Sequence, residues 1–275
     1  MQRVLPAEHE YLRPNKKFPS VWCPGCGNGI VLGAIIRAVG SLRLDKNEVV
    51  MVSGIGCSGR MPVYVDFDAI HTTHGRALAF ATGIKLARPE LTVIVVMGDG
   101  DALAIGGNHF IHAARRNVDL SAIIINNDTY GMTGGQYSPT TPQGARATTA
   151  PYGHIEPPFD VAALASAAGA PFVARSTVYH ALELQRLIAL SIQKKGFSVV
   201  EVISHCHVQY GHLNQMASPV DWMRWHRDHT ISAQEAARGD GAGDKLVRGV
   251  LVDRDVPEYT EKYRKLVARV QKSGS

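Results

Sequence analysis

Residues 91–101 read LTVIVVMGDGD, and this stretch decides the fold. The unbroken apolar run at 91–97 predicts a strand buried on both faces. The glycines after it allow a tight turn and a close approach of the backbone to a ligand. Residues 121–126 predict a second buried strand, and residues 102–116 between them have the length and composition of a crossover helix. Together the three segments predict a βαβ unit within an α/β fold.

Polar side chains follow both predicted strands. Asp99 comes directly after the first strand, and Asn127 follows Asp99 by 28 positions. Because ligands bind at the carboxyl ends of parallel strands, we expect these two side chains to lie together. Their oxygens suit Mg²⁺, which also takes diphosphate oxygens. A solvated turn with a helix-capping aspartate is the structural alternative. The spacing resembles the thiamine-diphosphate motif, in which GDG precedes a two-asparagine stretch, here Asn126-Asn127.

The whole chain has the composition of a globular protein. Its 275 residues are 45% hydrophobic and can bury one sizeable core. The net charge is +5, but lysine and arginine form no run or stripe, which argues against nucleic-acid binding. No apolar run reaches membrane-spanning length, and the first residues lack the pattern of a signal sequence. We therefore expect a cytoplasmic protein without a membrane partner.

Periodicity and turn signals predict the remaining elements. We expect a strand at 48–53, a last strand at 198–203, and helices at 27–39, 75–87, 161–168, 179–195 and 259–270. The long loop at 130–158 is expected to be functional or bound to a partner. We expect an arm at 1–20 that lies on another surface, a main domain at 21–221, and an extension outside the core at 222–275.

Four cysteines, Cys23, Cys26, Cys57 and Cys206, are more typical of a metal site than of disulfides in a cytosolic chain. The first two form a short chelating pair, and the other two follow predicted strands. A structural zinc ion and a [4Fe–4S] cluster both remain open on spacing alone. A redox-active dithiol leaves two of the four without a role. If the strands before Cys57 and Asp99 are parallel neighbours, the metal centre and the diphosphate site lie side by side.

Five motifs jointly resemble the β subunit of 2-oxoacid:ferredoxin oxidoreductases. They are WCPGCG at 22–27, GIGCSGR at 54–60, THGR at 73–76, GDGD at 98–101 and NNDTYGMTGGQ at 126–136. The likeness runs through roughly residues 20–206, and the spelling GMTGGQ is most like that of the 2-oxoglutarate enzymes. It implies the thiamine-diphosphate-binding fold, a mainly parallel sheet with helices on both faces.

The resemblance also implies site residues within the main domain. All four cysteines would ligate a [4Fe–4S] cluster, while Asp99, Asn127 and the backbone carbonyl of Thr129 would bind Mg²⁺. His74 and Arg76 are candidates for contacting the substrate carboxylate or the cofactor, and a capped helix start with a satisfied histidine is the alternative. The residues expected to bind thiamine diphosphate are Ile55, Gly56, Cys57, Ser58, His74, Gly100, Asp101, Asn127, Gly131, Met132 and Thr133.

The implied reaction is oxidative decarboxylation of a 2-oxoacid, expected to be 2-oxoglutarate, with CoA to acyl-CoA and CO₂. Electrons would pass singly through the cluster to ferredoxin. No glutamate here has a context that identifies it as the activator of the cofactor, and in the family that residue comes from the α subunit. We therefore expect activity only with the α subunit, in a dimer of αβ heterodimers. Gly134 stands where some relatives carry a lysine associated with substrate binding.

Three alternatives remain. The first is the β subunit of a pyruvate:ferredoxin oxidoreductase. A different thiamine enzyme, such as an acetolactate-synthase-like decarboxylase, would leave the cysteines unused. A non-catalytic subunit that binds zinc or transfers electrons would leave the diphosphate motif unexplained.

Overall fold

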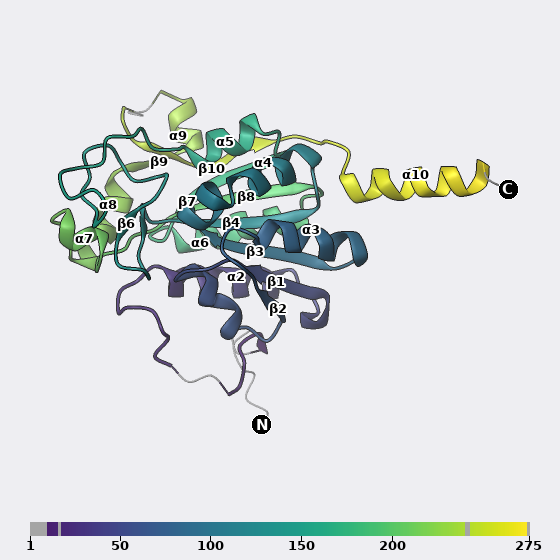
Figure 1. Cartoon of the computed structure of the whole chain (residues 1–275), viewed down its shortest axis with the longest axis horizontal. Helices are drawn as coiled ribbons and strands as arrows, with labels where there is room; N and C mark the ends of the chain where they lie inside the picture. Colours follow the sequence, from purple (N-terminus) through teal and green to yellow (C-terminus); the bar gives the residue numbers. More distant parts are fainter. Residues whose placement is uncertain (1–9, 16–17, 240–242, 274–275) are drawn as a thin grey trace.

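An eight-stranded sheet forms the centre of the computed structural model, which describes residues 10–15, 18–239 and 243–273 (Figure 1). The strand order is β2-β1-β3-β4-β8-β7-β10-β9. The first six run parallel, β10 is antiparallel to β7, and β9 is parallel to β10. The strands are β1 (Val49–Ser53), β2 (Asp68–His71), β3 (Thr92–Gly98), β4 (Leu120–Asn126), β7 (Phe172–Thr177), β8 (Phe197–Ile203), β9 (Thr230–Ser232) and β10 (Leu246–Asp253).

Helices cover both faces of this sheet, which confirms the predicted fold class. One core contains residues of α2 (Asn28–Ser41) and α6 (Ala181–Gln193), which pack against each other. The other core contains residues of α3 (Ala77–Ala87), α4 (Gly107–Arg116) and α5 (Val161–Ala167). The remaining helical segments are η1 (Lys46–Glu48), η2 (Ser58–Val63), η3 (Asp101–Ile105), α7 (Tyr210–Leu213), α8 (Pro219–Asp228), α9 (Ala233–Ala237) and α10 (Tyr259–Ser273).

Strand β3 contributes to both cores. Ile94 and Val96 belong to the core with α2 and α6, whereas Val93, Val95 and Met97 belong to the other. This alternation is the two-residue period of a strand, and it explains why the run 93–97 is apolar throughout. The buried β-branched residues fix β3 between β1 and β4.

The crossover from β3 to β4 is helical, as predicted, but it is not one continuous α-helix. It begins with the π-helical turn η3 and continues as α4 after Gly106. The backbone of Gly106 leaves no room for a side chain, because an added Cβ would overlap the carbonyl oxygen of Asp101. Such π-helical turns are frequent at functional sites.

Six strands were not predicted: β2, β7, β9 and β10 of this sheet, and β5 (Thr129–Tyr130) and β6 (Gln136–Tyr137), which form a separate two-stranded sheet. Residues 198–203 are not the last strand. The prediction that the segment from 222 onward lies outside the core is wrong for β10, which pairs with β7 at the sheet edge. Strand β7 carries Arg175, which is buried and donates to Glu201 of β8 at 2.7 Å. The charge of Arg175 breaks the apolar pattern expected of a buried strand. Its burial could not be predicted, because its partner Glu201 is distant in sequence. The domain limits at 20 and 222 stay predictions.

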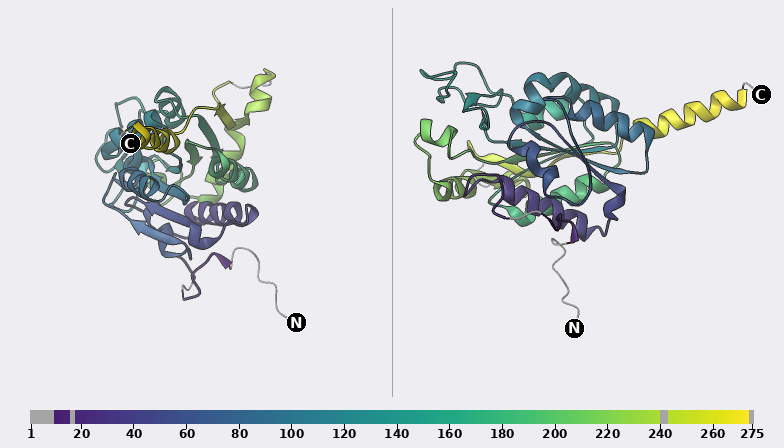
Figure 2. Two further views of the ribbon diagram at one scale, coloured as in Figure 1. Left: turned by 90° about the vertical axis from the view of Figure 1, so that its right-hand side faces the viewer. Right: turned by 60° about the horizontal axis from the view of Figure 1, so that its bottom comes forward.

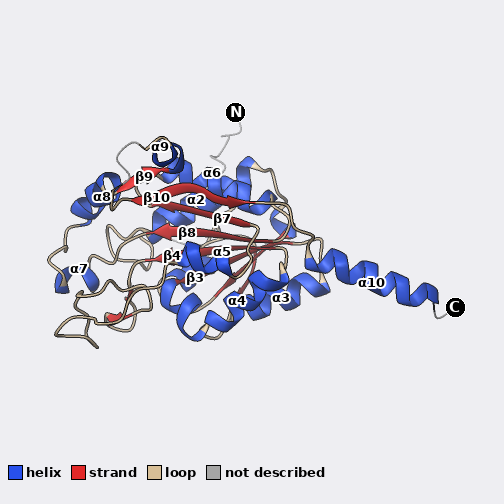
Figure 3. Cartoon of the chain, turned by 90° about the horizontal axis from the view of Figure 1, so that it is seen from above, coloured by secondary structure: helices blue, strands red, loops and turns tan. Residues whose placement is uncertain are grey.

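The two chain ends behave differently. In the described part of the N-terminal arm, Tyr11 is buried against the body of its own chain. Its hydroxyl donates to the Leu44 carbonyl at 3.0 Å. Helix α10 instead projects away from the body, and its residues 261–273 are exposed (Figure 2). The loops that follow β3 and β4 gather at the opposite end of the sheet (Figure 3). Among the described residues, no helix is both long and apolar enough to span a membrane.

Asn117 joins the last part of the chain to the body, and we expect its replacement to cost stability. Its side-chain amide donates to the carbonyls of Val256 and Pro257, and its Oδ1 accepts from the backbone of Phe197 at 2.8 Å. Its φ of 57° also favours asparagine over alanine. In urea denaturation, Asn117→Ala should lower the free energy of unfolding by about 2–4 kcal/mol. The control Asn47→Ala, at an exposed asparagine, should change it little; equal effects would contradict this role.

Candidate functional site

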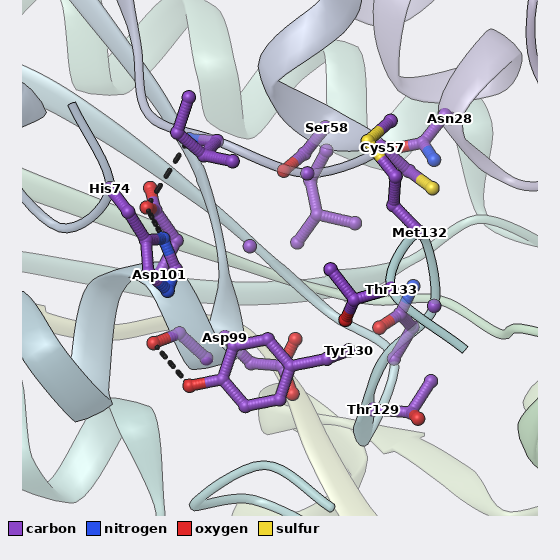
Figure 4. Close-up of a pocket in the computed structure, with 17 residues that line it drawn as sticks. Asn28, Cys57, Ser58, His74, Asp99, Asp101, Thr129, Tyr130, Met132 and Thr133 are labelled. Atoms are coloured by element: carbon purple, nitrogen blue, oxygen red, sulfur yellow. Dashed lines mark hydrogen bonds and ion pairs between the residues drawn. The ribbon is translucent and has the colours of Figure 1, made fainter. Parts of the chain in front are cut away.

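A pocket with about 690 Å³ of open space lies at the carboxyl ends of β1, β3 and β4 (Figure 4). The pocket exists because three neighbouring parallel strands end at one edge of the sheet, where their connecting loops diverge. We refer to it as the diphosphate pocket.

The structure brings every predicted cofactor-binding residue to this pocket, although their roles stay predictions. Asp99 and Thr129, two of the predicted Mg²⁺ ligands, line it as well. Asn28 and Tyr130 also line it, and sequence reasoning did not single them out. The predicted residues that line it are Ile55, Gly56, Cys57, Ser58, His74, Gly100, Asp101, Asn127, Gly131, Met132 and Thr133.

Asp99 is a buried carboxylate held by two hydroxyl groups. Its Oδ2 accepts from Ser138 Oγ at 2.5 Å and from Thr140 Oγ1 at 2.6 Å. Burial raises the pKa of the Asp99 carboxyl, although both hydroxyl donors act in the opposite direction. Hydrogen bonds of this kind orient a metal-binding carboxylate. The donor set of Asp99, Asn127 and the Thr129 carbonyl is all oxygen, which fits Mg²⁺.

Asp101 holds the loops around the pocket together. Its Oδ1 accepts from the backbone of Gly75 at 2.7 Å and of Ile55 at 3.2 Å, and it lies 2.5 Å from His74 Nδ1. Gly54 is required beside it, because an added Cβ would overlap the Asp101 carboxylate. The predicted cofactor residue therefore also positions two loops.

His74 combines the two interpretations given to it from the sequence. Its Nδ1 is satisfied by Asp101, and its side chain still lines the diphosphate pocket with 36% of its surface exposed. Nε2 is then the ring atom that can meet a ligand. Arg76 does not line the pocket. Its Nη1 donates to the His74 carbonyl at 3.2 Å and to the Ile105 carbonyl at 3.4 Å, so it supports the loop that carries His74.

Tyr130 closes one side of the pocket. Its hydroxyl donates to the Gly100 carbonyl at 3.0 Å, and its ring occupies the space that a Gly100 side chain would need. The glycine in GDGD therefore admits an aromatic ring. Burial, with a smaller contribution from the Asp99 and Asp101 charges, raises the pKa of Tyr130 to about 12. The phenol stays a hydrogen-bond donor at neutral pH. The position of Tyr130 within the motif at 126–136 is the sequence signal that could have identified it.

All four cysteines line a second pocket, which we refer to as the cysteine pocket. Cys57 lines both pockets, as does Asn28. An added Cβ on Gly131 would lie 3.2 Å from Cys206 Sγ and 4.0 Å from Cys57 Sγ, so both sulfurs face this glycine. Within residues 10–15, 18–239 and 243–273, no group of three or more His, Cys, Asp and Glu side chains is arranged to hold a metal ion. The four-cysteine ligand set therefore stays a prediction.

The chemistry of the cysteine pocket nevertheless fits a metal centre. Burial, reinforced by the neighbouring cysteines, raises the pKa of Cys57 to about 11. Burial also raises the pKa of Cys26, against a hydrogen bond that its Sγ accepts from Asn28 Nδ2 at 3.2 Å. Thiols in such surroundings become thiolates when a cation joins them. Four sulfur donors in one place suit zinc or an iron–sulfur cluster.

The histidines beside Cys206 pack around this pocket. His205 is buried, with its Nε2 2.9 Å from the Gly25 carbonyl and its Nδ1 3.2 Å from His226 Nε2. Both ring nitrogens thus have protein partners, so His205 packs beside the cysteines without a free nitrogen. Trp22 donates from its Nε1 to the Cys57 carbonyl at 2.7 Å and fixes the chain after β1.

Comparison with known proteins gives a consistent result. Residues 54–202 match the family described as thiamine pyrophosphate enzyme, C-terminal TPP binding domain. The 2-oxoglutarate synthase subunit KorB of Archaeoglobus fulgidus is 51% identical over 268 residues, which is 96% of this chain and 95% of the relative. The protein of the same description from Methanocaldococcus jannaschii is 48% identical over 264 residues, covering 95% of this chain and 97% of the relative.

A third relative, the 2-oxoacid:ferredoxin oxidoreductase subunit beta of Saccharolobus solfataricus, is 48% identical over 187 residues. The match covers 67% of this chain and 61% of that relative. Among solved structures, the 2-oxoglutarate:ferredoxin oxidoreductase of Magnetococcus marinus, with 2-oxoglutarate, coenzyme A and succinyl-CoA bound, superposes with a TM-score of 0.85. It is 34% identical, over 96% of this chain and 90% of that chain.

Thiol reactivity tests the electrostatics of the cysteine pocket. In the reduced, metal-free chain at pH 8, iodoacetamide should modify exposed Cys23 faster than Cys57, because only the thiolate reacts. The Cys57 rate should keep rising as the pH approaches its pKa of about 11. Peptide mass spectrometry of timed samples gives both rates, and the urea-unfolded chain is the control in which the two should converge. Equal rates in the folded chain would contradict the predicted environment.

Proposed function

Because the chain belongs to the β subunits of 2-oxoacid:ferredoxin oxidoreductases, we propose that it carries both thiamine diphosphate with Mg²⁺ and a [4Fe–4S] cluster in such an enzyme. The complete enzyme would oxidatively decarboxylate a 2-oxoacid with CoA, giving acyl-CoA and CO₂, and pass the electrons to ferredoxin. One observation carries the proposal: Cys57 lines both the cysteine pocket and the diphosphate pocket. A site for electron removal would thus adjoin a site for decarboxylation.

The residues of the diphosphate pocket would bind and orient thiamine diphosphate and its Mg²⁺ ion. When bound, thiamine diphosphate supplies carbanion-stabilising chemistry, and the cluster supplies one-electron transfer. Asp99, Asn127 and the Thr129 carbonyl would hold Mg²⁺ and through it the diphosphate. Asp101 keeps the loops at Ile55 and Gly75 in place, so that the pocket is formed before a ligand enters.

The preferred substrate in this proposal is 2-oxoglutarate. It rests on the GMTGGQ motif and on the names of the relatives and of the structural neighbour, which has 2-oxoglutarate bound. His74 would contact a substrate carboxylate through Nε2, with Arg76 holding the loop behind it. Gly134, with φ of 113°, offers no side chain in place of the lysine found in some relatives. Pyruvate is the alternative substrate.

An α subunit would complete the site, in a dimer of αβ heterodimers. The loop 130–158 offers a surface for it, because Tyr152 and Ile155 are 101% and 82% exposed. Their burial on assembly would remove apolar surface from water. The α subunit would also supply the glutamate that activates the cofactor. A cytoplasmic location fits ferredoxin and CoA as partners.

Reconstitution tests the proposed function. The isolated chain, loaded anaerobically, should not turn over any 2-oxoacid, because no identifiable residue here activates the cofactor. Adding the α subunit should produce CoA-dependent reduction of ferredoxin or a viologen dye, faster with 2-oxoglutarate than with pyruvate. Initial rates of dye reduction measure this, with omission of CoA as the control. CoA-dependent turnover by the isolated chain would contradict the division of labour, and faster turnover of pyruvate would contradict the substrate.

A further inference from the structure

Asn28, the first residue of α2, lies in the wall between the two pockets. Its side chain is 1% exposed and lines both of them. We infer that its amide couples the two sites, donating a hydrogen bond to the Cys26 sulfur and accepting one from an N–H or O–H group of the ligand in the diphosphate pocket. This inference rests on the proposed function, since it needs a cluster on one side and thiamine diphosphate on the other.

The donor side of the amide is defined by a contact. Asn28 Nδ2 lies 3.2 Å from Cys26 Sγ. Hydrogen bonds to the sulfurs are among the factors that set the reduction potential of an iron–sulfur cluster. Because reduction adds negative charge, a donor to sulfur stabilises the reduced state more than the oxidised state. The Asn28 amide should therefore raise the potential of a cluster bound through Cys26.

The acceptor side of the amide is unsatisfied. Among the described residues, Asn28 Oδ1 is buried and has no hydrogen-bond partner. Buried polar atoms in native proteins nearly always have partners. Figure 4 shows Asn28 beside Cys57 and Met132 on the wall of the diphosphate pocket. A ligand donor in that pocket would supply the missing partner.

The local backbone keeps the amide in this position. Gly27 precedes it at the start of α2, and an added Cβ there would overlap Ser204 Oγ, so the chain is packed directly against the segment after β8. The buried Asn28 amide is therefore held where it faces both pockets at the same time. When Oδ1 accepts a hydrogen bond, the polarised amide becomes a better donor at Nδ2. Ligand binding should thus strengthen the hydrogen bond to Cys26.

The test measures the midpoint potential of the cluster in the complete αβ enzyme, by a redox titration monitored by electron paramagnetic resonance. Titrations with and without thiamine diphosphate and Mg²⁺ are compared for the wild type, Asn28→Leu and Asn28→Ala. Both substitutions remove the donor and the acceptor without adding a charge beside the cluster. Gly29→Ala, on the same turn of α2, is the control, because apart from the helix's own backbone an added Cβ there meets no atom within 4 Å.

We expect both Asn28 variants to have a lower potential than the wild type, and Gly29→Ala to match the wild type. The shift in midpoint potential that the cofactor causes should be more positive in the wild type than in Asn28→Leu. Iron content and visible absorption are measured first: a wild type without a cluster refutes the proposed function itself. If clusters are present and the Asn28 variants share the wild-type potential, or respond to the cofactor as the wild type does, the coupling is refuted. If Asn28→Leu does not fold, the smaller Asn28→Ala decides the donor effect, and its response to the cofactor decides the coupling.

Discussion

The parallel pairing of β1, β3 and β4 is the constraint on which the rest of the structure depends. These strands are held in register by apolar side chains that alternate between two cores, so their carboxyl ends meet at one edge of the sheet. Cys57, Asp99 and Asn127 follow those ends. A polar site of this kind cannot be assembled from one segment, and the sheet brings its parts together without any direct bond between them. Both pockets inherit their place from this pairing.

The two aspartates of the GDGD motif have different hydrogen-bond partners, and these partners suit them to different roles. Asp99 receives two hydroxyl donors on Oδ2, which fix the orientation of its buried carboxyl group. The Oδ1 atom of Asp101, two residues later, instead contacts two backbone amides and His74, and so fixes the loops of the pocket. The first carboxylate suits metal binding, whereas the second suits preorganisation. The distinction follows from their partners, since the residue type is the same.

Local patterns next to strand ends predicted the βαβ unit and the meeting of Asp99 with Asn127, whereas the resemblance to the family predicted the mainly parallel sheet and most residues of the diphosphate pocket. The sequence did not predict β7 or β10. In β7 the buried Arg175 needs Glu201 of another strand, and such pairing leaves no local signal. The supports of Asp99 were missed for the same reason, since Ser138 lies 39 positions away in a loop. Asn28 was predicted only as part of a helix, because the pocket that it lines beside the nearby Cys26 sulfur is formed by segments that are distant in sequence.

The central claim is that two groups are held by separate ligand sets on either side of a shared wall. The most direct test is the content of iron and thiamine diphosphate per chain after anaerobic purification with Mg²⁺, for the wild type, Asp99→Ala and Cys206→Ala, each with its α subunit. The wild type should hold about four irons and one thiamine diphosphate. Asp99→Ala should lose thiamine diphosphate and keep iron, whereas Cys206→Ala should lose the cluster and keep thiamine diphosphate. Zinc in place of iron, or iron content unchanged in Cys206→Ala, would contradict the account.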